Sequence, residues 1–143
     1  ERFDRVLGDL QAIVFESDLE NNKVTYEIPT ALKETWGEIS TSGTQEEGYK
    51  NLRKDFLKPY KDAFRDHVTG KTQEVSVEHI NVHEGKETWY QTRAKATFEN
   101  GRATKLTGIV ENIDKRKSLE LEVQKAQKQV YDAINNIEGG VIL

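Results

Sequence analysis

The chain has 143 residues, of which 32% are charged and 35% are hydrophobic, and its net charge is −4 at pH 7. This length fits one domain with an appendage, and the interspersed charges without a basic stripe argue against a nucleic-acid partner. The sequence has no run of about 18 apolar residues, so it predicts no membrane span.

Cysteine is absent from the sequence. Its absence excludes disulfide bonds, thiolate nucleophiles and cysteine-based metal sites, and it fits a reducing compartment. Methionine is absent too, and the chain opens on Glu1 without a secretory signal. We therefore expect a piece of a longer cytoplasmic protein.

The first third of the chain contains short elements. Apolar residues at helical spacing predict an amphipathic helix over residues 1–10. Two short strands are predicted over residues 12–18 and 23–28, with a turn between them and Pro29 ending the second. Thr30 is expected to cap a short helix over residues 31–36.

The middle third is predicted to be helical after a polar loop. Residues 40–48 are polar and contain glycine, which is typical of a mobile loop. Helices are predicted over residues 49–57 and 59–68. In the second of these, Tyr60, Ala63, Phe64 and Val68 make one apolar face.

The pattern then changes to a period of two. Residues 75–82, 89–98 and 105–113 are predicted strands, separated by Glu84-Gly85 and Asn100-Gly101. Asn-Gly between two alternating segments is a strong hairpin motif. The sequence therefore predicts a three-stranded antiparallel meander.

A heptad stripe follows from Asp114 onward. Its apolar positions are spaced by alternating steps of four and three residues, which predicts one long helix with a seam for a second copy of the chain. In a parallel dimer with Leu119 at position d, Lys115 would face Glu120 of the partner helix. Packing of this stripe on the helix's own domain is the alternative. The predicted dimer seam consists of Leu119, Val123, Ala126, Val130, Ala133 and Ile137.

Two segments of the chain resemble each other at a constant offset of 128 residues. Phe3-Asp4-x-Val6 matches Tyr131-Asp132-x-Ile134, and residues 12–15 match residues 140–143. We expect a domain over residues 1–113, a coiled-coil linker helix over residues 114–137 and the start of a second, similar domain over residues 138–143.

The second half of the chain resembles the Per-Arnt-Sim (PAS) family of sensor domains with its PAC motif. Trp89 opens a strand, Glu99-Asn100-Gly101 makes the turn, and the last strand ends with Asn112-Ile113-Asp114-Lys115-Arg116-Lys117. Asn112 stands where the family usually has Asp, and Asp114 where it usually has Thr. The resemblance implies an α+β fold: a five-stranded antiparallel sheet flanked by short helices, with a long C-terminal signalling helix.

The family also implies a function. Such a module would sense a ligand or a partner and pass the change to an output domain, for example a histidine kinase or a cyclic-dinucleotide enzyme. A ligand-free dimerisation spacer is the alternative. An enzyme is not expected, since no nucleophile or organised acid–base set emerges. The signal junction would consist of Trp89, Asn112, Ile113, Asp114 and Arg116.

A ligand pocket is predicted from strand alternation and the family fold. It would be mostly apolar with two or three hydroxyl groups, although neighbouring side chains could equally fill this space. The ligand is not identified by the sequence, and the cysteine-linked flavin chemistry of one branch of the family is excluded. The candidate lining residues are Phe15, Ser17, Tyr26, Tyr90, Thr92, Ala94, Ala96, Leu106, Gly108 and Val110.

Ionisable side chains give no organised site in the sequence. His67 is expected to be a solvent-exposed structural residue, and haem is not expected because the family's haem ligand falls nearer Pro59. His79 and His83 share a strand face but lack a third ligand, so no metal site is predicted. Asp62 and Asp66 lie one helical turn apart and are expected on a solvated face.

Overall fold

The computed structural model describes residues 2–33 and 42–140, and it describes side chains for residues 4–33 and 42–137. The chain divides into two compact units, Glu1–Asn112 and Ile113–Leu143. The first contains one sheet with short helices, and the second contains a single long helix.

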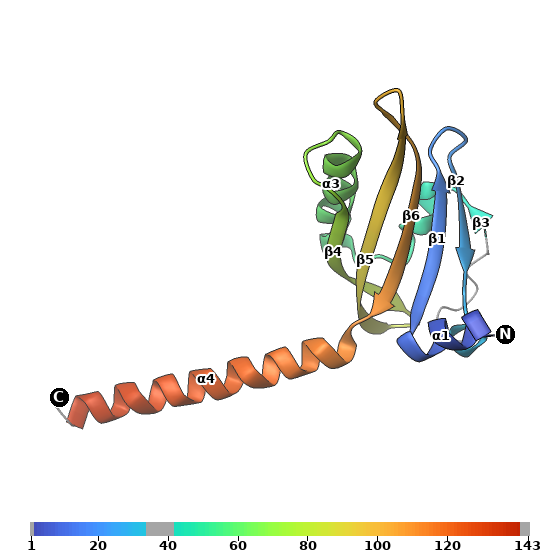
Figure 1. The fold of residues 1–143 in the computed structure, drawn as a ribbon. Coiled ribbons are helices and arrows are strands. Elements are labelled where there is room, and N and C mark those ends of the chain that lie inside the picture. Colours follow the sequence, from blue (N-terminus) through green and yellow to red (C-terminus); the bar gives the residue numbers. More distant parts are fainter. Residues whose placement is uncertain (1, 34–41, 141–143) are drawn as a thin grey trace. The chain divides into compact units, whose positions relative to one another are not determined.

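The first unit is built on an antiparallel sheet with the strand order β3-β2-β1-β6-β5-β4 (Figure 1). The five predicted strands are present, which confirms the α+β fold class. A sixth strand, β3, adds two residues to the edge. The strands are β1 (Ala12–Asp18), β2 (Lys23–Glu27), β3 (Ser42–Gly43), β4 (Val75–His83), β5 (Lys86–Glu99) and β6 (Arg102–Asn112).

Both predicted hairpins of the meander are confirmed. Glu84-Gly85 connects β4 to β5 and Asn100-Gly101 connects β5 to β6. All four residues have positive φ, between 50° and 78°. Positive φ at both central positions is the turn geometry that matches the twist of the flanking strands. The turn residues therefore fix the register in which β5 pairs with its two neighbours.

The alternation of the strands gives the sheet one buried face. In β5, Tyr90, Thr92 and Ala94 point to this face and are almost fully buried. The side chains between them, such as Arg93 and Lys95, are exposed. The core on the buried face includes Phe15, Val24, Val75, Tyr90, Ala94, Leu106 and Val110.

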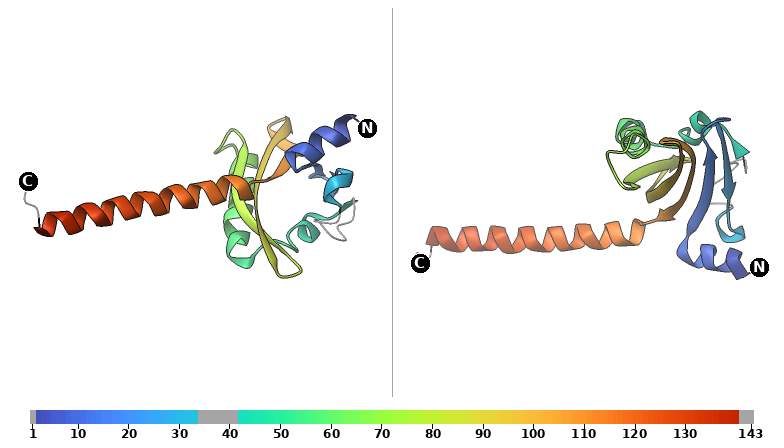
Figure 2. Two further views of the ribbon diagram at one scale, coloured as in Figure 1. Left: turned by 90° about the horizontal axis from the view of Figure 1, so that it is seen from below. Right: turned by 45° about the horizontal axis from the view of Figure 1, so that its top comes forward.

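Short helices complete the first unit. Figures 1 and 2 show α2 and α3 on the same face of the sheet. The 59–68 helix is confirmed within α3. The helices are α1 (Arg2–Leu10), α2 (Gln45–Gly48), α3 (Leu57–Val68) and the 3₁₀ helices η1 (Thr30–Leu32) and η2 (Lys54–Phe56).

The predicted loop over residues 40–48 is wrong for the part that the structure describes. Residues 42–48 contain β3 and α2, and Thr44 begins α2 with a capping box. The Thr44 hydroxyl accepts the Glu47 N–H at 3.3 Å, and Glu47 Oε1 accepts the Thr44 N–H at 2.7 Å. This reciprocal pair stabilises a helix too short to form alone. Residues 40 and 41 lie outside the described residues.

The predicted helix over residues 49–57 is also wrong. Residues 51–53 extend along the edge of β4 instead: Arg53 N–H donates to the Ile80 carbonyl at 2.8 Å, and Val82 N–H donates to the Asn51 carbonyl at 2.7 Å. Pairing with a sheet edge satisfies backbone groups that a local helix would otherwise satisfy. Only η2 keeps helical backbone before α3 begins.

The predicted cap at Thr30 is wrong as well. Pro29 precedes η1 and Thr30 is its first residue. The Thr30 N–H donates to Asp4 Oδ1 at 2.9 Å, so Thr30 is bound by α1 rather than capping a helix itself. Residues 34–36 of the helix predicted here lie outside the described residues.

The second unit contains α4 (Asp114–Gly140), a continuous helix of 27 residues. Ion pairs one turn apart support it, with Arg116 and Glu120 at 3.2 Å and Lys128 and Asp132 at 2.9 Å. The helix extends three residues beyond the predicted 114–137, and residues 141–143 lie outside the described part. The predicted domain boundaries and the truncated second domain stay predictions. Among the described residues, no helix is long and apolar enough to cross a membrane.

Candidate functional site

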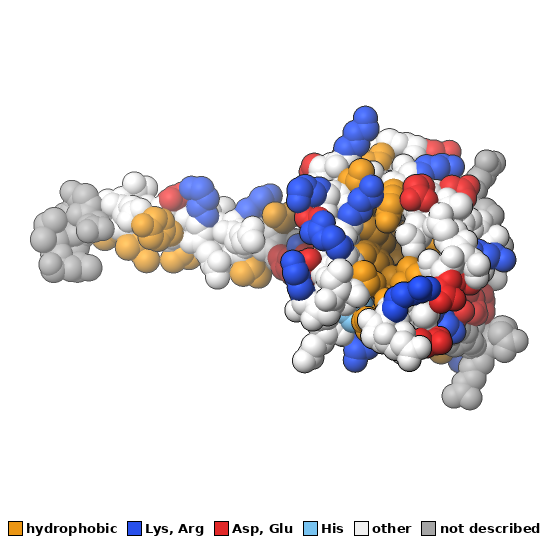
Figure 3. Space-filling view, turned by 90° about the horizontal axis from the view of Figure 1, so that it is seen from above, with side chains coloured by type: hydrophobic (Ala, Val, Ile, Leu, Met, Phe, Trp, Pro, Cys, Tyr) orange, Lys and Arg blue, Asp and Glu red, His pale blue; other side chains and the backbone are white. Residues whose placement is uncertain are grey.

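A cavity of about 500 Å³ lies between the buried face of the sheet and the segment that contains α2 and α3. Figure 3 shows it as an apolar hollow that is open on this face of the first unit. Side chains from β1, β2, β4 and β6 form one side, and residues 42–52 and α3 form the other. We call these the sheet side and the helical side of the cavity.

The sheet side contains half of the predicted pocket residues. Phe15, Ser17, Tyr26, Leu106 and Val110 line the cavity. The other five predicted residues, Tyr90, Thr92, Ala94, Ala96 and Gly108, are absent from its lining. Whether any of the ten binds a ligand stays a prediction.

Phe15 explains why Gly108 does not contribute open space. A Cβ atom at Gly108 would lie 2.6 Å from Phe15 Cζ, 2.6 Å from the Arg93 carbonyl oxygen and 2.7 Å from the Ala94 Cβ. The phenyl ring therefore occupies the room that glycine provides. The small residues of β5 and β6 make space for packed neighbours, and the cavity begins beyond them.

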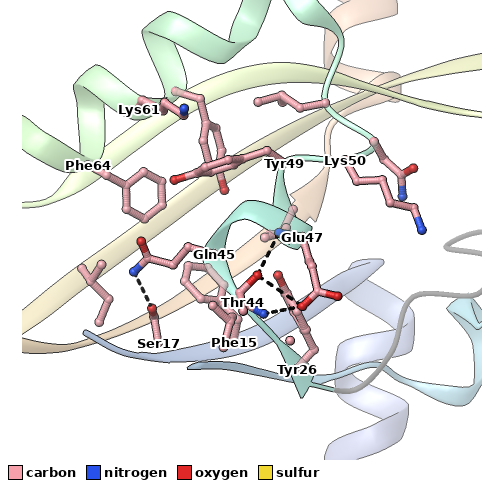
Figure 4. A pocket seen from close by; sticks show the side chains of 18 of the residues that line it. Phe15, Ser17, Tyr26, Thr44, Gln45, Glu47, Tyr49, Lys50, Lys61 and Phe64 are labelled. Atoms are coloured by element: carbon pink, nitrogen blue, oxygen red, sulfur yellow. Dashed lines mark hydrogen bonds between the residues drawn. The ribbon is translucent and has the colours of Figure 1, made fainter. Parts of the chain in front are cut away.

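The helical side was not predicted from the sequence. Gln45 reaches across the cavity from α2, and its Nε2 donates to the Ser17 hydroxyl at 3.3 Å (Figure 4). From α3, Tyr60 and Phe64 contribute rings whose centroids lie 4.9 Å apart, and the Tyr49 ring meets Tyr60 edge-on at 6.0 Å. Two sequence features could have indicated this side: the apolar face of residues 59–68 and the capping-box pattern Thr44-x-x-Glu47.

His79 lies at the inner end of the cavity and is 2% exposed. Its Nδ1 lies 2.9 Å from Asn81 Oδ1, and its Nε2 lies 2.7 Å from the Thr92 hydroxyl. Burial lowers the pKa of His79 to about 4, against the opposing effect of the bond with Asn81. The ring is therefore neutral near pH 7. Since Asn81 Oδ1 can only accept, Nδ1 carries the proton and the Thr92 hydroxyl donates to Nε2.

The phenol groups around the cavity are neutral too. Burial raises the pKa of Tyr26, of Tyr49 and of Tyr60. At Tyr60 a hydrogen bond with Thr92 opposes part of this effect. The inner part of the cavity thus offers aromatic faces and neutral polar groups.

His67 is not exposed, in contrast to the prediction. It is 4% exposed, and its Nε2 accepts the Ala96 N–H at 2.9 Å while its Nδ1 lies 3.0 Å from the Thr72 carbonyl. The β4 ladder ends where Val75 pairs with Ala94, so the next free N–H of β5 on this edge is satisfied by the imidazole. His67 is structural, and it connects the end of α3 to β5.

The remaining ionisable candidates form no site. His83 is partly exposed beside Glu84 and does not line the cavity to which His79 contributes. Asp62 is paired with Lys58 at 2.8 Å and with Arg65 at 3.0 Å, and the hydrogen bond from Lys58 lowers its pKa, which is opposite to what a general acid requires. Among the described residues, no three His, Asp or Glu side chains are grouped to hold a metal ion.

The predicted signal junction contains residues from the end of the sheet and the start of α4. The Trp89 ring meets Phe56 edge-on at 5.5 Å, and the next residue, Tyr90, pairs with Asn112 at the end of β6. Asn112 N–H donates to the Gln11 carbonyl at 3.0 Å, just before β1. Ile113 connects β6 to α4, whose first residue is Asp114, and Arg116 pairs with Glu120. A signalling role for these residues stays a prediction.

Solved structures with similar folds are PAS domains of signalling proteins. A sensory box histidine kinase/response regulator from Burkholderia thailandensis aligns with a TM-score of 0.72 over 92% of this chain and 99% of its own, at 17% identity. The N-terminal domain of a diguanylate cyclase with a PAS/PAC sensor from Marinobacter aquaeolei gives 0.62 over 74% and 98%, at 13% identity. A domain of a putative light and redox sensing histidine kinase from Haloarcula marismortui gives 0.60 over 79% and 99%, at 18% identity.

These likenesses confirm the resemblance found in the sequence. The chain has the fold of a PAS sensor domain. By sequence alone, neither a family model nor a curated protein matches the chain. At these identities the likeness establishes the fold.

Proposed function

We propose that residues 2–112 form a sensory module that binds a small molecule in the cavity between the sheet side and the helical side. The cavity itself carries this proposal. Small-molecule sites are typically about 300–1,000 Å³, mostly apolar, and contain a few polar groups. At about 500 Å³, this cavity combines aromatic and aliphatic walls with Ser17, Gln45 and Asn81. Such open space favours ligand binding over the ligand-free spacer, for which a filled core would serve better.

The second part of the proposal concerns the output. A change in the sheet would pass from β6 through Asn112, Ile113 and Asp114 into α4, and from there to an output domain in the parent protein. The similar structures come from a histidine kinase and a diguanylate cyclase, which supports an output of one of these two kinds. Asp114, in the first turn of α4, has the charge that a helix N-terminus favours.

Dimerisation through α4 is the third part. Leu119, Val123, Val130 and Ile137 are each 53–59% exposed, so their apolar surface is available to a second copy of the helix. Glu120 already pairs with Arg116 and with Lys117 within its own helix. A salt bridge from Lys115 of a partner helix to Glu120 would compete with these pairs. These charges therefore favour a parallel alignment of the two helices only weakly. We infer a weak parallel seam, which suits a helix that must change register or rotation.

Ligand binding is tested by filling the cavity. In Gln45→Trp an indole would replace the side chain that crosses the cavity, whereas Glu46→Trp, its exposed neighbour outside the lining, is the matched control. We expect native mass spectrometry or a thermal-shift screen to find a compound that binds wild type and Glu46→Trp but not Gln45→Trp. Equal binding to all three proteins would place the ligand elsewhere, and a screen without any binder would favour the spacer.

The dimer seam of α4 is tested by introducing charged side chains into it. Val123→Asp combined with Val130→Asp would bury two carboxylates in a dimer, which is costly unless they are paired. We expect sedimentation to shift toward monomer at concentrations where wild type is dimeric. Gln124→Asp with Tyr131→Asp, which adds the same number of carboxylates one residue away from each seam position, is the control. An unchanged mass of the valine variant would refute the seam.

The relay is tested with Asp114→Ala in a full-length parent. Loss of this carboxylate from the first turn of α4 costs about 0.3–1 kcal/mol of helix stability, and the sheet core does not include this side chain. We expect the domain to stay folded while output activity no longer depends on the signal. Normal regulation in this variant would place the junction elsewhere.

A further inference from the structure

In the described part of the chain, no charged side chain lies at the inner end of the cavity. The nearest ionisable side chains there are His79 and Tyr60, whose rings meet edge-on at 4.9 Å. Tyr90 stacks on the other side of His79 at 6.2 Å. The buried imidazole of His79 and the phenol of Tyr60 are both neutral near pH 7. An ionised group of a ligand would therefore lose its hydration at the inner end without gaining a counter-charge.

The walls of the cavity are shaped for a flat ring system. On the sheet side, Phe15 and Tyr26 lie with their ring centroids 6.5 Å apart. On the helical side, Tyr49, Tyr60 and Phe64 form a continuous series of ring contacts. Figure 4 shows Tyr49 and Phe64 on one side and Phe15 and Tyr26 on the other, with the Gln45 side chain reaching in between them. Aromatic faces on opposite sides favour a planar ligand, which can contact both at once.

The mouth of the cavity is cationic. Lys50, Lys61 and Arg65 are part of the lining, and among the residues that the structure describes, Glu47 is the one acidic side chain in it. Glu47 is already bound by the N–H and hydroxyl of Thr44, at 2.7 and 3.2 Å. In Figure 3, basic side chains stand along one margin of the apolar hollow.

Lys61 is the cation best placed for a ligand. Its Nζ lies 5.1 Å from the centroid of the Tyr49 ring, and in the described part of the chain no carboxylate forms an ion pair with it. Arg65, by contrast, is paired with Asp62 at 3.0 Å, and the charge of Lys50 is partly offset by Glu47. A ligand anion at the mouth would therefore meet Lys61 first.

We propose that the cavity takes a planar aromatic anion, with its rings between Phe15 and Phe64 and its acidic group at Lys61. This inference rests on the proposed ligand-binding function and adds the ligand's charge, shape and orientation. Lys61 is then the residue that determines specificity for an acid over its neutral analogue. The apolar ring system provides most of the contact area, and the ion pair selects among ring systems of the same shape.

The test uses two fluorescent probes with the same rings. 1-Anilinonaphthalene-8-sulfonate is an anion, and N-phenyl-1-naphthylamine lacks the sulfonate. We expect the full chain to bind the anion more tightly, and Lys61→Gln to weaken its binding about five- to tenfold with little effect on the neutral probe. Lys58→Gln, which removes a charge from the same helix outside the cavity lining, should change neither. Raising NaCl from about 50 to about 300 mM should weaken the binding of the anionic probe only, because salt screens its attraction to the basic side chains at the mouth.

The outcomes separate the two proposals. Loss of neutral-probe binding in Gln45→Trp would show that the cavity is a ligand site. If the anionic probe then binds no better than the neutral one, and Lys61→Gln has no selective effect, the anion proposal is wrong. Equal weakening of both probes by Lys61→Gln also overturns it, since Lys61 would then act by packing. If wild type binds neither probe, both this inference and the ligand-binding function fail.

Discussion

The sheet side of the cavity is held by long backbone ladders, whereas the helical side is held by a few side-chain contacts. On the sheet side, β1 pairs with β6 over seven residues, and Phe15, Leu106 and Val110 are nearly inaccessible to solvent. On the helical side, α2 has four residues and depends on the Thr44–Glu47 capping box, and residues 51–53 attach to β4 by two backbone bonds.

This difference assigns distinct roles to the two sides. Ladders with many buried contacts open only with global unfolding, whereas short elements with exposed hydrogen bonds open locally at low cost. If the cavity binds a ligand as proposed, we expect the ligand to enter on the helical side and binding to change the structure there. The sheet side provides the fixed surface and leads directly into β6, which precedes α4.

The first prediction compares the loss of stability when a glycine is replaced on the sheet side and on the helical side of the cavity. Gly108→Ala would place a Cβ 2.6 Å from the Arg93 carbonyl, which is backbone and cannot move alone. We expect a loss of about 2–3 kcal/mol in the free energy of unfolding, typical of overpacking. In Gly48→Ala the only contact is the Tyr26 hydroxyl at 2.8 Å, at the end of a side chain. A cost below about 1 kcal/mol is expected there, since alanine also favours the helix.

Urea denaturation of the two variants checks this pair. If Gly108→Ala were as stable as Gly48→Ala, the sheet side would be as adaptable as the helical side. The two sides of the cavity would then not differ in rigidity.

The second prediction concerns pH. His79 has a folded pKa of about 4 against 6.5 for the unfolded chain, so the unfolded state takes up a proton first as the pH falls. Stability should be fully present above about pH 6.5 and should decline toward pH 4, by up to about 3 kcal/mol from this residue. Tyr60, which packs against the ring, does not ionise in this window because burial raises its pKa.

The experiment compares two histidines of the same strand. Urea midpoints of wild type, His79→Gln and His83→Gln are measured between pH 7 and pH 4. The change of the urea midpoint with pH should become smaller in His79→Gln. The variant is also less stable at neutral pH, because Thr92 loses its hydrogen bond with the imidazole. His83→Gln should retain the wild-type slope. An unaltered slope in His79→Gln would mean that the buried ring does not control this transition.

The smallest effect concerns the helical side. Thr44→Ala removes the hydroxyl that accepts the Glu47 N–H, which should cost about 1 kcal/mol. Because α2 opens locally, the change should appear in hydrogen exchange at the amides of Glu47 and Gly48 and leave exchange in β5 unaffected. Thr44→Ser keeps the hydroxyl and should restore protection. Faster exchange throughout the sheet would show that the helical side is an integral part of the folding unit.

The meander and the site differ in how well the sequence predicted them. The β4–β6 strands were predicted closely because their alternation and Asn100-Gly101 act over short distances in sequence. The segment before α3 on the helical side was not predicted. The backbone groups of residues 51–53 form their hydrogen bonds with the edge of β4, almost 30 residues later in the chain. Likewise His67, a polar residue expected in solvent, is buried because the ladder of β4 ends at Ala94, two residues before Ala96, and its imidazole accepts the Ala96 N–H instead.

The sequence by itself determined five of the six strands, the two glycine turns of the meander, most of α3 and the long helix α4, because each follows from periodicity and turn chemistry within a short window. It also indicated the buried face of the sheet. Tertiary structure alone decided which part of that face is filled and which is open. Phe15 fills the space above Gly108, while Gln45, Tyr49 and Tyr60 leave a cavity beyond it, and this outcome depends on residues that meet only when the chain has folded.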